Sequence, residues 1–327
     1  MTTTYNLQPT TYDLIIIGGG PAGSAAAVYA ARKRLKTLLI TSEFGGQSAV
    51  SFEIQNWIGT PAISGAELAE NLKRHVNTYA GDILTIKEGE KVTSVKKTDL
   101  FAETSAQTGG EFEVTTESGA IFHAKSILVA TGSSRRKLQA LNADVLEHKG
   151  LTYCASCDGP MFSGADVAVI GGGNAAFETA AQLLAYTKSV TLLNHSKGWK
   201  ADPGTVEKVL SNPKMKAVEN VDVVEVRGDK FVDGLVYKNK KTGESVELSV
   251  KGIFVETGQI PNTDFVKDIV DLDPYNRIRI NPRNQQTNQL GIWAAGDATD
   301  ILYHQNNIAA GDGVKAVEDI YLYLRAK

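Results

Sequence analysis

The sequence predicts an α/β fold with two Rossmann-like dinucleotide-binding domains, because one pattern occurs twice along its 327 residues. In each copy, a short apolar run typical of a buried parallel strand leads into a glycine-rich turn, and an alanine-rich helix follows. The first copy covers residues 12–40 and the second covers residues 166–193. Two such units in one chain indicate two bound dinucleotides, one for each fold.

The composition is that of a globular protein long enough for two hydrophobic cores, with 42% apolar and 22% charged residues. The formal net charge of −3 gives no basic field, so we expect no nucleic-acid partner. The N-terminal residues do not have the basic and apolar regions of a signal peptide, and no apolar run is long enough to span a bilayer. We therefore expect a cytoplasmic protein with no membrane partner.

The first glycine motif follows the apolar run at residues 14–17 directly. Its first glycine allows a tight turn, its second lets the backbone approach a pyrophosphate, and its third lets the helix pack on the strand. An acid about 20 residues further on would bind a ribose hydroxyl, and Glu43 lies near that position. A tight turn without a ligand is the alternative interpretation. The candidate residues here are Gly18, Gly20, Pro21, Ala22, Gly23 and Glu43.

The second glycine motif follows the apolar run at residues 167–170, and the same physical reasoning applies to it. A further apolar run at residues 190–193 follows at the spacing that a Rossmann-like unit requires. A helix-start turn with no ligand is again the alternative. The candidate residues for a nicotinamide dinucleotide are Gly171, Gly173, Asn174, Ala175, Ala176 and Glu178.

The segments between and after these units predict additional strands. Residues 82–95 and 111–129 alternate in polarity, which predicts an antiparallel ribbon inserted into the first fold. A second ribbon is expected over residues 221–255. Short strands at 277–280 and 292–295 and a helix over 307–325 complete the prediction.

The two cysteines of the chain, Cys154 and Cys157, are separated by two residues, which allows their sulfurs to form a disulfide. In a cytosolic chain this spacing indicates redox chemistry or metal binding. The adjacent Asp158 is a candidate for moving the proton that a thiol gains or loses. A zinc site would need about four ligands, and the five histidines are scattered along the sequence. Two buried cysteines without a function are the remaining alternative.

Taken together and in this order, the motifs resemble the low-molecular-weight thioredoxin reductases. They also resemble the flavoprotein core of the reductase subunit of alkyl hydroperoxide reductase. The resemblance extends from Tyr12 to Leu324. Besides the two glycine motifs and the cysteine pair, the motifs that support it are residues 45–47, 56–59, 130–132, 258–262 and 291–297.

The resemblance implies a second domain inserted into the first. The FAD-binding domain would comprise residues 1–137 and 263–327, and the NAD(P)H-binding domain, with the cysteine pair, residues 138–262. Further residues would then line FAD, with Asp297 on the ribityl chain and His304 near the isoalloxazine ring. Those residues are Gly46, Gln47, Asn56, Thr131, Gly132, Gly296, Asp297, His304 and Gln305.

The resemblance also implies the electron route. NADPH, or alternatively NADH, would reduce FAD, and FAD would reduce the Cys154–Cys157 disulfide after a rotation between the two domains. Cys157 would face the flavin, and Cys154 would react with a thioredoxin- or glutaredoxin-like protein. The family also implies a homodimer.

The sequence departs from that pattern in two places. The thioredoxin reductases that use NADPH carry arginines for the 2′-phosphate after the last strand of the second fold, and residues 193–200 contain none. Asn194, His195 and Lys200 are the substitute candidates, and they are equally consistent with a solvated surface. His304 replaces the usual arginine or lysine. Two alternatives therefore stay open, a disulfide reductase of the same fold fed by ferredoxin or another donor, and a flavin redox sensor without turnover.

Overall fold

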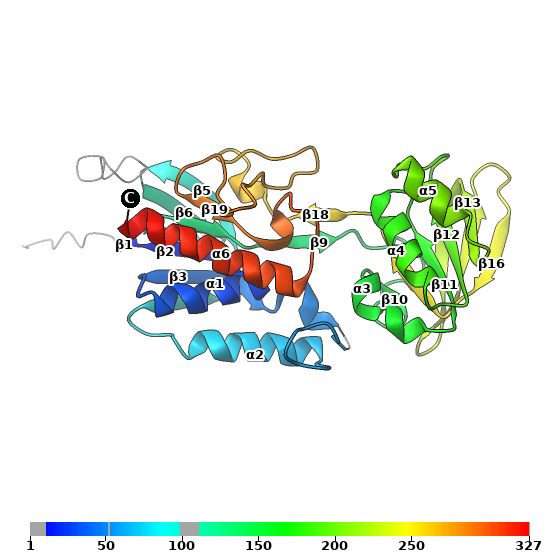
Figure 1. Cartoon of the computed structure of the whole chain (residues 1–327), viewed down its shortest axis with the longest axis horizontal. Helices are drawn as coiled ribbons and strands as arrows, with labels where there is room; N and C mark the ends of the chain where they lie inside the picture. Colours follow the sequence, from blue (N-terminus) through cyan, green and yellow to red (C-terminus); the bar gives the residue numbers. More distant parts are fainter. Residues whose placement is uncertain (1–10, 52, 99–110, 327) are drawn as a thin grey trace, which may run out of the picture. The chain divides into compact units, whose positions relative to one another are not determined.

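The computed structural model describes residues 11–51, 53–98 and 111–326. The chain divides into two compact units, which Figure 1 shows with their helices and strands labelled. Unit 1 consists of residues 1–51, 63–134 and 260–327, and unit 2 consists of residues 52–62 and 135–259. The domain boundaries expected from the resemblance stay a prediction.

Unit 1 is built on a parallel five-stranded sheet whose strand order is β19-β8-β2-β3-β4. Helices α1 and α6 lie side by side and pack on this sheet together with α2 (Figure 1). The bounds of these elements are β2 (Leu14–Gly19), α1 (Pro21–Arg32), β3 (Thr37–Phe44), α2 (Gly65–Asn77), β4 (Leu84–Glu88), β8 (Ile127–Val129), β19 (Ile292–Ala294) and α6 (Asn306–Arg325).

The other face of the parallel sheet is covered by a second, four-stranded sheet. Alternate side chains of β2 enter different cores, as strand geometry requires: Ile16 packs with the helices, and Ile15 packs with Phe112 of the second sheet. Unit 1 therefore has three layers, helix, parallel sheet and second sheet. The strands of the second sheet, in the order β1-β7-β6-β5, are β1 (Thr11–Tyr12), β5 (Val92–Thr98), β6 (Glu111–Thr116) and β7 (Ile121–Ala124).

Unit 2 repeats this architecture. Its parallel sheet has the order β10-β17-β11-β12-β13, and an antiparallel sheet β14-β15-β16 covers one face. Val169 of β11 packs with the helices, and Ala168 packs with the antiparallel sheet. The elements are β10 (Leu151–Thr152), α3 (Ala155–Asp158), β11 (Asp166–Ile170), α4 (Asn174–Leu184), β12 (Ser189–Asn194), α5 (Pro203–Leu210), β13 (Met215–Glu219), β14 (Val221–Gly228), β15 (Val232–Asn239), β16 (Ser245–Ser249) and β17 (Gly252–Val255).

The two parallel sheets have the same strand order around their first strand, so β2 corresponds to β11 and β8 corresponds to β17. In both sheets the order reverses at that strand, which creates the switch point where doubly wound folds bind ligands. The predicted fold class, with two Rossmann-like three-layer domains, is confirmed. Two paired strands, β9 (Ser133–Arg135) and β18 (Gln259–Pro261), include two of the four positions where the chain passes between the units.

Several predicted segments were assigned to the wrong sheet. β4 and β8 belong to the parallel sheet rather than to the inserted ribbon, and β17 likewise belongs to the parallel sheet of unit 2. β4 is an edge strand that runs from the buried Leu84 to the exposed Lys87 and Glu88, so its sequence lacks the continuous apolar run of a central parallel strand. Residues 277–280 form no strand and make only isolated bridges at Ile278. The short 3-10 helices are η1 (Gly46–Val50), η2 (Gly159–Phe162), η3 (Asp264–Val266) and η4 (Gly296–Ala298).

Within the part of the chain that is described, we find no helix with the length and apolar character needed to cross a membrane.

Candidate active site

The glycine turn of unit 1 has the geometry that its spacing predicts. Gly18 has a φ of +112°, and a Cβ on it would lie 2.3 Å from the Ala130 carbonyl oxygen. A Cβ on Gly23 would lie 1.8 Å from the Gly18 carbonyl oxygen, so helix α1 packs directly against β2. Gly20, by contrast, has no heavy atom within 4 Å of its Cβ position. The turn is therefore closed on the protein side and open at the one glycine expected to face a pyrophosphate.

Other residues of the predicted FAD set meet this turn at the carboxyl end of the parallel sheet. A Cβ on Gly46, which begins η1 after β3, would lie 3.6 Å from the Gly20 Cα atom. A Cβ on Gly296, which begins η4 after β19, would lie 3.5 Å from the Cβ atom of Ala22, in the first turn of α1. The segment with Thr131 and Gly132 leaves the end of β8 beside Gly18. Asp297 follows Gly296 and is half-buried.

The polar side chains of this set have diverse local partners. The Gln47 amide donates to the Ser133 carbonyl oxygen, and the Thr131 hydroxyl donates to the Asn262 carbonyl oxygen at 2.7 Å. His304 Nε2 lies 3.2 Å from the Ile301 carbonyl oxygen, just before Gln305, the N-cap residue of α6.

Two residues of the set are placed differently. Glu43 is exposed near the end of β3, and its carbonyl oxygen accepts a bond from Thr41 at 2.6 Å. Asn56 lies in the segment of unit 2 that precedes residue 63, and its amide is 3.4 Å from the Ser156 carbonyl oxygen. The roles of both toward FAD stay predictions.

The glycine turn of unit 2 has the same geometry as that of unit 1. Gly171 has a φ of +152°, and a Cβ there would lie 2.5 Å from the Glu256 carbonyl oxygen. Gly173 has an open Cβ position with no heavy atom within 4 Å. Ala176 replaces the third glycine and is fully buried between helix α4 and the sheet. Ala175 and Glu178 are exposed on the first turns of α4.

The loop after β12 packs over this turn. The Lys200 N–H donates to the Gly172 carbonyl oxygen at 2.7 Å. Asn194 is buried, and its amide donates to the Gly198 carbonyl oxygen at 2.6 Å. The Asn174 carboxamide oxygen accepts from the N–H of Asp202 at 2.8 Å. The residues predicted for the nucleotide are thus brought together, and the Asn194 amide also fixes the loop.

His195 is exposed and engaged at both ring nitrogens. Nδ1 bonds Asp222, and Nε2 lies 2.9 Å from the Lys240 ammonium. An anion approaching His195 would therefore meet a ring that is already bridged between a carboxylate and an ammonium group.

Glu256 was not identified from the sequence, although it lies directly beyond β17 at the glycine turn of unit 2. Its carboxylate accepts a hydrogen bond from the Thr179 hydroxyl of α4 at 2.7 Å. Burial raises the pKa of Glu256 to about 7, opposed by the Thr179 hydrogen bond and by Arg135, while Glu178 adds to the increase. The sequence does show an acidic residue immediately after an apolar strand. That residue becomes a site candidate only once β17 is known to pair with β11, the strand that leads into the glycine turn.

The two cysteines form a disulfide, with a Cα–Cα distance of 5.3 Å. Cys154 is the N-cap residue of the short helix α3, and the Cys157 N–H lies 3.1 Å from the Cys154 sulfur. A thiolate formed at Cys154 would be stabilised by this N–H donor, since hydrogen bonds to a charged form favour it.

Asp158 is part-buried directly after the disulfide. The Thr152 hydroxyl donates to its carboxylate, and the Cys154 N–H lies 3.4 Å from the same hydroxyl oxygen. Burial raises the pKa of Asp158, and the Thr152 hydrogen bond and the nearby His148 act in the opposite direction. Thr152 was missed because nothing in the local sequence indicates that the chain reverses between β10 and α3.

Helix α3 rests on helix α4. The Ser156 hydroxyl donates to the Gln182 carboxamide oxygen at 3.1 Å. A Cβ on Gly159 would lie 2.1 Å from the Tyr186 hydroxyl, so a larger residue there would displace the Tyr186 side chain. The disulfide-bonded turn is therefore fixed to α4 of unit 2.

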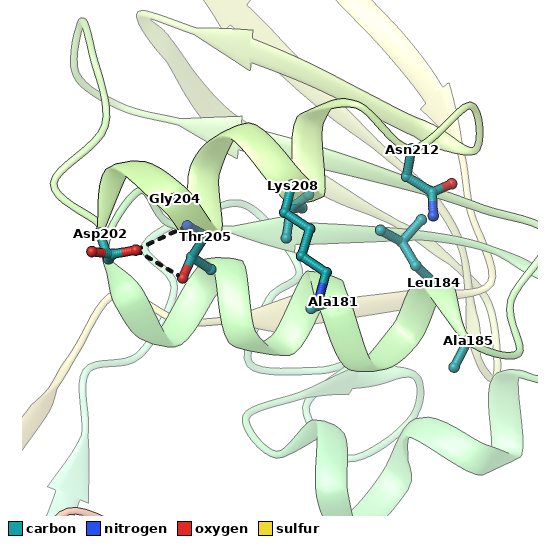
Figure 2. A pocket seen from close by; sticks show the side chains of 9 residues that line it. Ala181, Leu184, Ala185, Asp202, Gly204, Thr205, Lys208 and Asn212 are labelled. Carbon is teal, nitrogen blue, oxygen red and sulfur yellow. Dashed lines mark hydrogen bonds between the residues drawn. The ribbon is translucent and has the colours of Figure 1, made fainter.

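A surface groove of about 550 Å³ lies between α4 and α5 (Figure 2). Figure 2 shows Leu184 of α4 and Lys208 of α5 among its lining residues, and Asp202 capping α5 through Thr205. None of the residues predicted for the cofactors or the cysteine pair line this groove. Across the described ranges, we find no cluster of three or more His, Cys, Asp or Glu residues that could hold a metal ion.

Comparison with known proteins gives a consistent family assignment. The family model for pyridine nucleotide-disulphide oxidoreductases matches residues 12–313. The chain superposes on a thioredoxin reductase from Streptococcus pyogenes with 31% identity and a TM-score of 0.88, covering 98% of this chain and 100% of that one. A thioredoxin reductase from Giardia duodenalis also gives a TM-score of 0.88, at 28% identity, covering 97% and 99%.

Among curated proteins, the chain is 38% identical to the F subunit of alkyl hydroperoxide reductase from Staphylococcus epidermidis, over 96% of this chain and 59% of that protein. It is also 34% identical to a protein of Bacillus subtilis named NADH dehydrogenase, over 96% of this chain and 58% of that one. The chain therefore spans less than two thirds of the length of these curated relatives.

Proposed function

Because the chain belongs to the pyridine nucleotide-disulphide oxidoreductase family, we propose that it is a flavoenzyme that reduces protein disulfides. Electrons would pass from NADPH or NADH through FAD to the Cys154–Cys157 disulfide, and then to a thioredoxin- or glutaredoxin-like protein. The observation on which the proposal rests is a disulfide beside a part-buried acid, in a chain with two dinucleotide folds. The predicted resemblance to thioredoxin reductases is confirmed, as is FAD with NADPH as the cofactor pair that those enzymes use.

The residues of unit 1 fit FAD. The open position at Gly20 admits the pyrophosphate, while the first N–H groups of α1 point toward the same site. Gly46, Gly296 and the Thr131 segment would border the remainder of the cofactor at the same sheet edge. When bound, FAD takes a hydride from a nicotinamide and passes two electrons on to a disulfide.

The residues of unit 2 fit a nicotinamide dinucleotide in the same way. Gly173 leaves room for the pyrophosphate, and the long helix α4 presents its N-terminus there. Asn194 lies at the end of β12, where a ribose hydroxyl binds in folds of this type. The neutral Asn194 amide supports binding of NADH as well as NADPH.

The cysteine pair and Asp158 then perform the thiol chemistry. Two electrons break the S–S bond, and Asp158 gives a proton to the Cys154 sulfur while the Cys157 sulfur stays a thiolate. The ionised Asp158 takes this proton back as Cys154 attacks the partner disulfide, which forms a mixed disulfide and releases one partner thiolate that is protonated by solvent. Cys157 attacks the Cys154 sulfur, which restores the original disulfide and releases the second partner thiolate.

Anaerobic titration of the purified protein tests the donor. We expect NADPH or NADH to bleach the flavin absorbance, and we expect turnover with dithionitrobenzoate and with thioredoxin. Bleaching by dithionite but by neither nucleotide would favour a ferredoxin-like donor instead. Bleaching without any disulfide turnover would favour a redox sensor.

Substitution at the cysteine pair tests the thiol step. Cys154→Ser should abolish disulfide turnover while leaving nucleotide-dependent bleaching intact, because it removes only the sulfur that meets the partner. Ser163→Ala, an exposed change beyond η2, is the matched control and should keep full turnover. Undiminished turnover by the Cys154→Ser variant would contradict the proposal.

We also propose a homodimer and a cytoplasmic location, as the family resemblance implies. Light scattering of the purified protein at micromolar concentration measures the oligomeric state. Fractionation of cells that express the full-length protein measures the location. A monomer, or recovery of the protein outside the cytoplasm, would contradict them.

A further inference from the structure

The two dinucleotide folds can be compared position by position at their switch points. In unit 1, Ala130 follows β8, and its N–H donates to the Ile17 carbonyl oxygen at 2.8 Å. In unit 2, Glu256 follows β17, and its N–H donates to the Ile170 carbonyl oxygen at 2.7 Å. Both residues also place their carbonyl oxygens against the first glycine of the turn. Where one fold carries a methyl group, the other carries a carboxyl group.

The surroundings of the Glu256 carboxyl group set its charge. From α4, the Thr179 hydroxyl donates to it, and Glu178 repels its negative form. From β9, Arg135 attracts that form. Burial outweighs the attraction and raises the pKa of Glu256 to about 7, so the group changes charge near neutral pH.

We propose that Glu256 makes nucleotide binding by unit 2 dependent on pH: the neutral carboxyl group permits binding at the Gly171–Gly173 turn, and the ionised one opposes it. This inference rests on the proposed function, since it takes a nicotinamide dinucleotide as the ligand of unit 2. The pyrophosphate at the turn carries two negative charges. A part-buried carboxylate at the same sheet edge repels them more strongly than a fully exposed surface carboxylate would.

The inference predicts both a change in affinity and an exchange of protons. If only the protonated form binds, the dissociation constant rises about tenfold between pH 6 and pH 8, by linkage. Binding above neutral pH should then take up a proton. The effect should apply to NAD⁺ and NADP⁺ alike, because both contain the pyrophosphate.

Isothermal titration calorimetry tests the predicted change in the dissociation constant. The oxidised full-length protein is titrated with NAD⁺ and with NADP⁺ at pH 6 and pH 8. Glu256→Gln keeps an oxygen that can accept from Thr179 and removes the charge. We expect this variant to bind at pH 8 as tightly as the wild type binds at pH 6. Glu244→Gln, an exposed acid in the turn between β15 and β16, is the control and should retain the tenfold change.

Repeating the titration at pH 7.5 in buffers of different ionisation enthalpy measures proton uptake by the wild type without any variant. Binding with no proton uptake, or an equal pH dependence in the wild type and Glu256→Gln, would overturn the inference and leave the proposed function in place. Absence of binding by both nucleotides at pH 6 would overturn both.

Discussion

Substitution of Thr152 tests how Asp158 exchanges a proton with the cysteine pair. Its hydroxyl donates to the Asp158 carboxylate and lies 3.4 Å from the Cys154 N–H, so one side chain contacts both groups. Thr152→Val keeps the shape of the side chain and removes the hydroxyl. Loss of a hydrogen bond to a charged group costs about 1.5 kcal/mol, which corresponds to about one pKa unit.

The direction of the Asp158 pKa shift depends on which protonation state of its carboxyl group the Thr152 hydroxyl stabilises. Burial raises the pKa of Asp158, and the Thr152 bond lowers it by favouring the ionised carboxylate. Removing the bond should raise the pKa further. If the ionised Asp158 accepts the proton of the Cys154 thiol, the acid limb of the rate profile should move about one unit to higher pH.

Stopped-flow reaction of the dithiothreitol-reduced protein with dithionitrobenzoate, measured from pH 5 to pH 9, gives that profile. Thr152→Ser retains a hydroxyl and should restore the wild-type profile, which a purely structural role would not require. A Thr152→Val profile that coincides with the wild type would refute the reasoning. So would a uniform loss of rate without a shift.

Three further predictions follow from the geometry. The free energy of unfolding of the wild type should fall by up to about 3 kcal/mol as pH rises from 4.5 to 7, because Glu256 binds its proton more tightly in the folded state; urea titration of Glu256→Gln should lack this decline. Gly20→Ala should give a folded protein with little flavin, whereas Gly18→Ala should lower the melting temperature as well, because its Cβ would collide with backbone; flavin absorbance and thermal scans distinguish the two. Asp202→Ala, which removes the cap that accepts from the Thr205 N–H, should destabilise unit 2 by about 1 kcal/mol in urea titrations and leave nucleotide binding intact, which calorimetry would check.

The sequence was sufficient for the parts of the fold that depend on local pattern. The run before Gly18, the turn and helix α1 follow one another without interruption, so apolar strand, glycine spacing and helix composition all point to one structure. The strand β8 was misassigned because three residues are too few for a period to be detected. Its continuous burial becomes evident only once its neighbours β2 and β19 are known.

The cysteine pair and both open glycines were predictable because their chemistry depends on spacing within one segment. The partners of Asp158 and the role of Glu256 were not, since each depends on contacts between segments. Glu256 meets Thr179 across 77 positions of sequence, and no pattern in a single chain specifies such a pair. Asn194 was placed correctly at the end of its strand, but its use in fixing the following loop depends on Gly198 folding back.

The pairing of β10 with β17 has a consequence for how unit 2 meets its reaction partners. These strands run parallel with Thr152 opposite Phe254, so the residues two positions further on are Cys154 and Glu256. The Cys154 sulfur and the residue that borders the glycine turn of unit 2 thus leave the sheet on the same rim. Under the proposed function, electrons and nucleotide would arrive at this one rim, and a distortion of this single strand pair would disturb both.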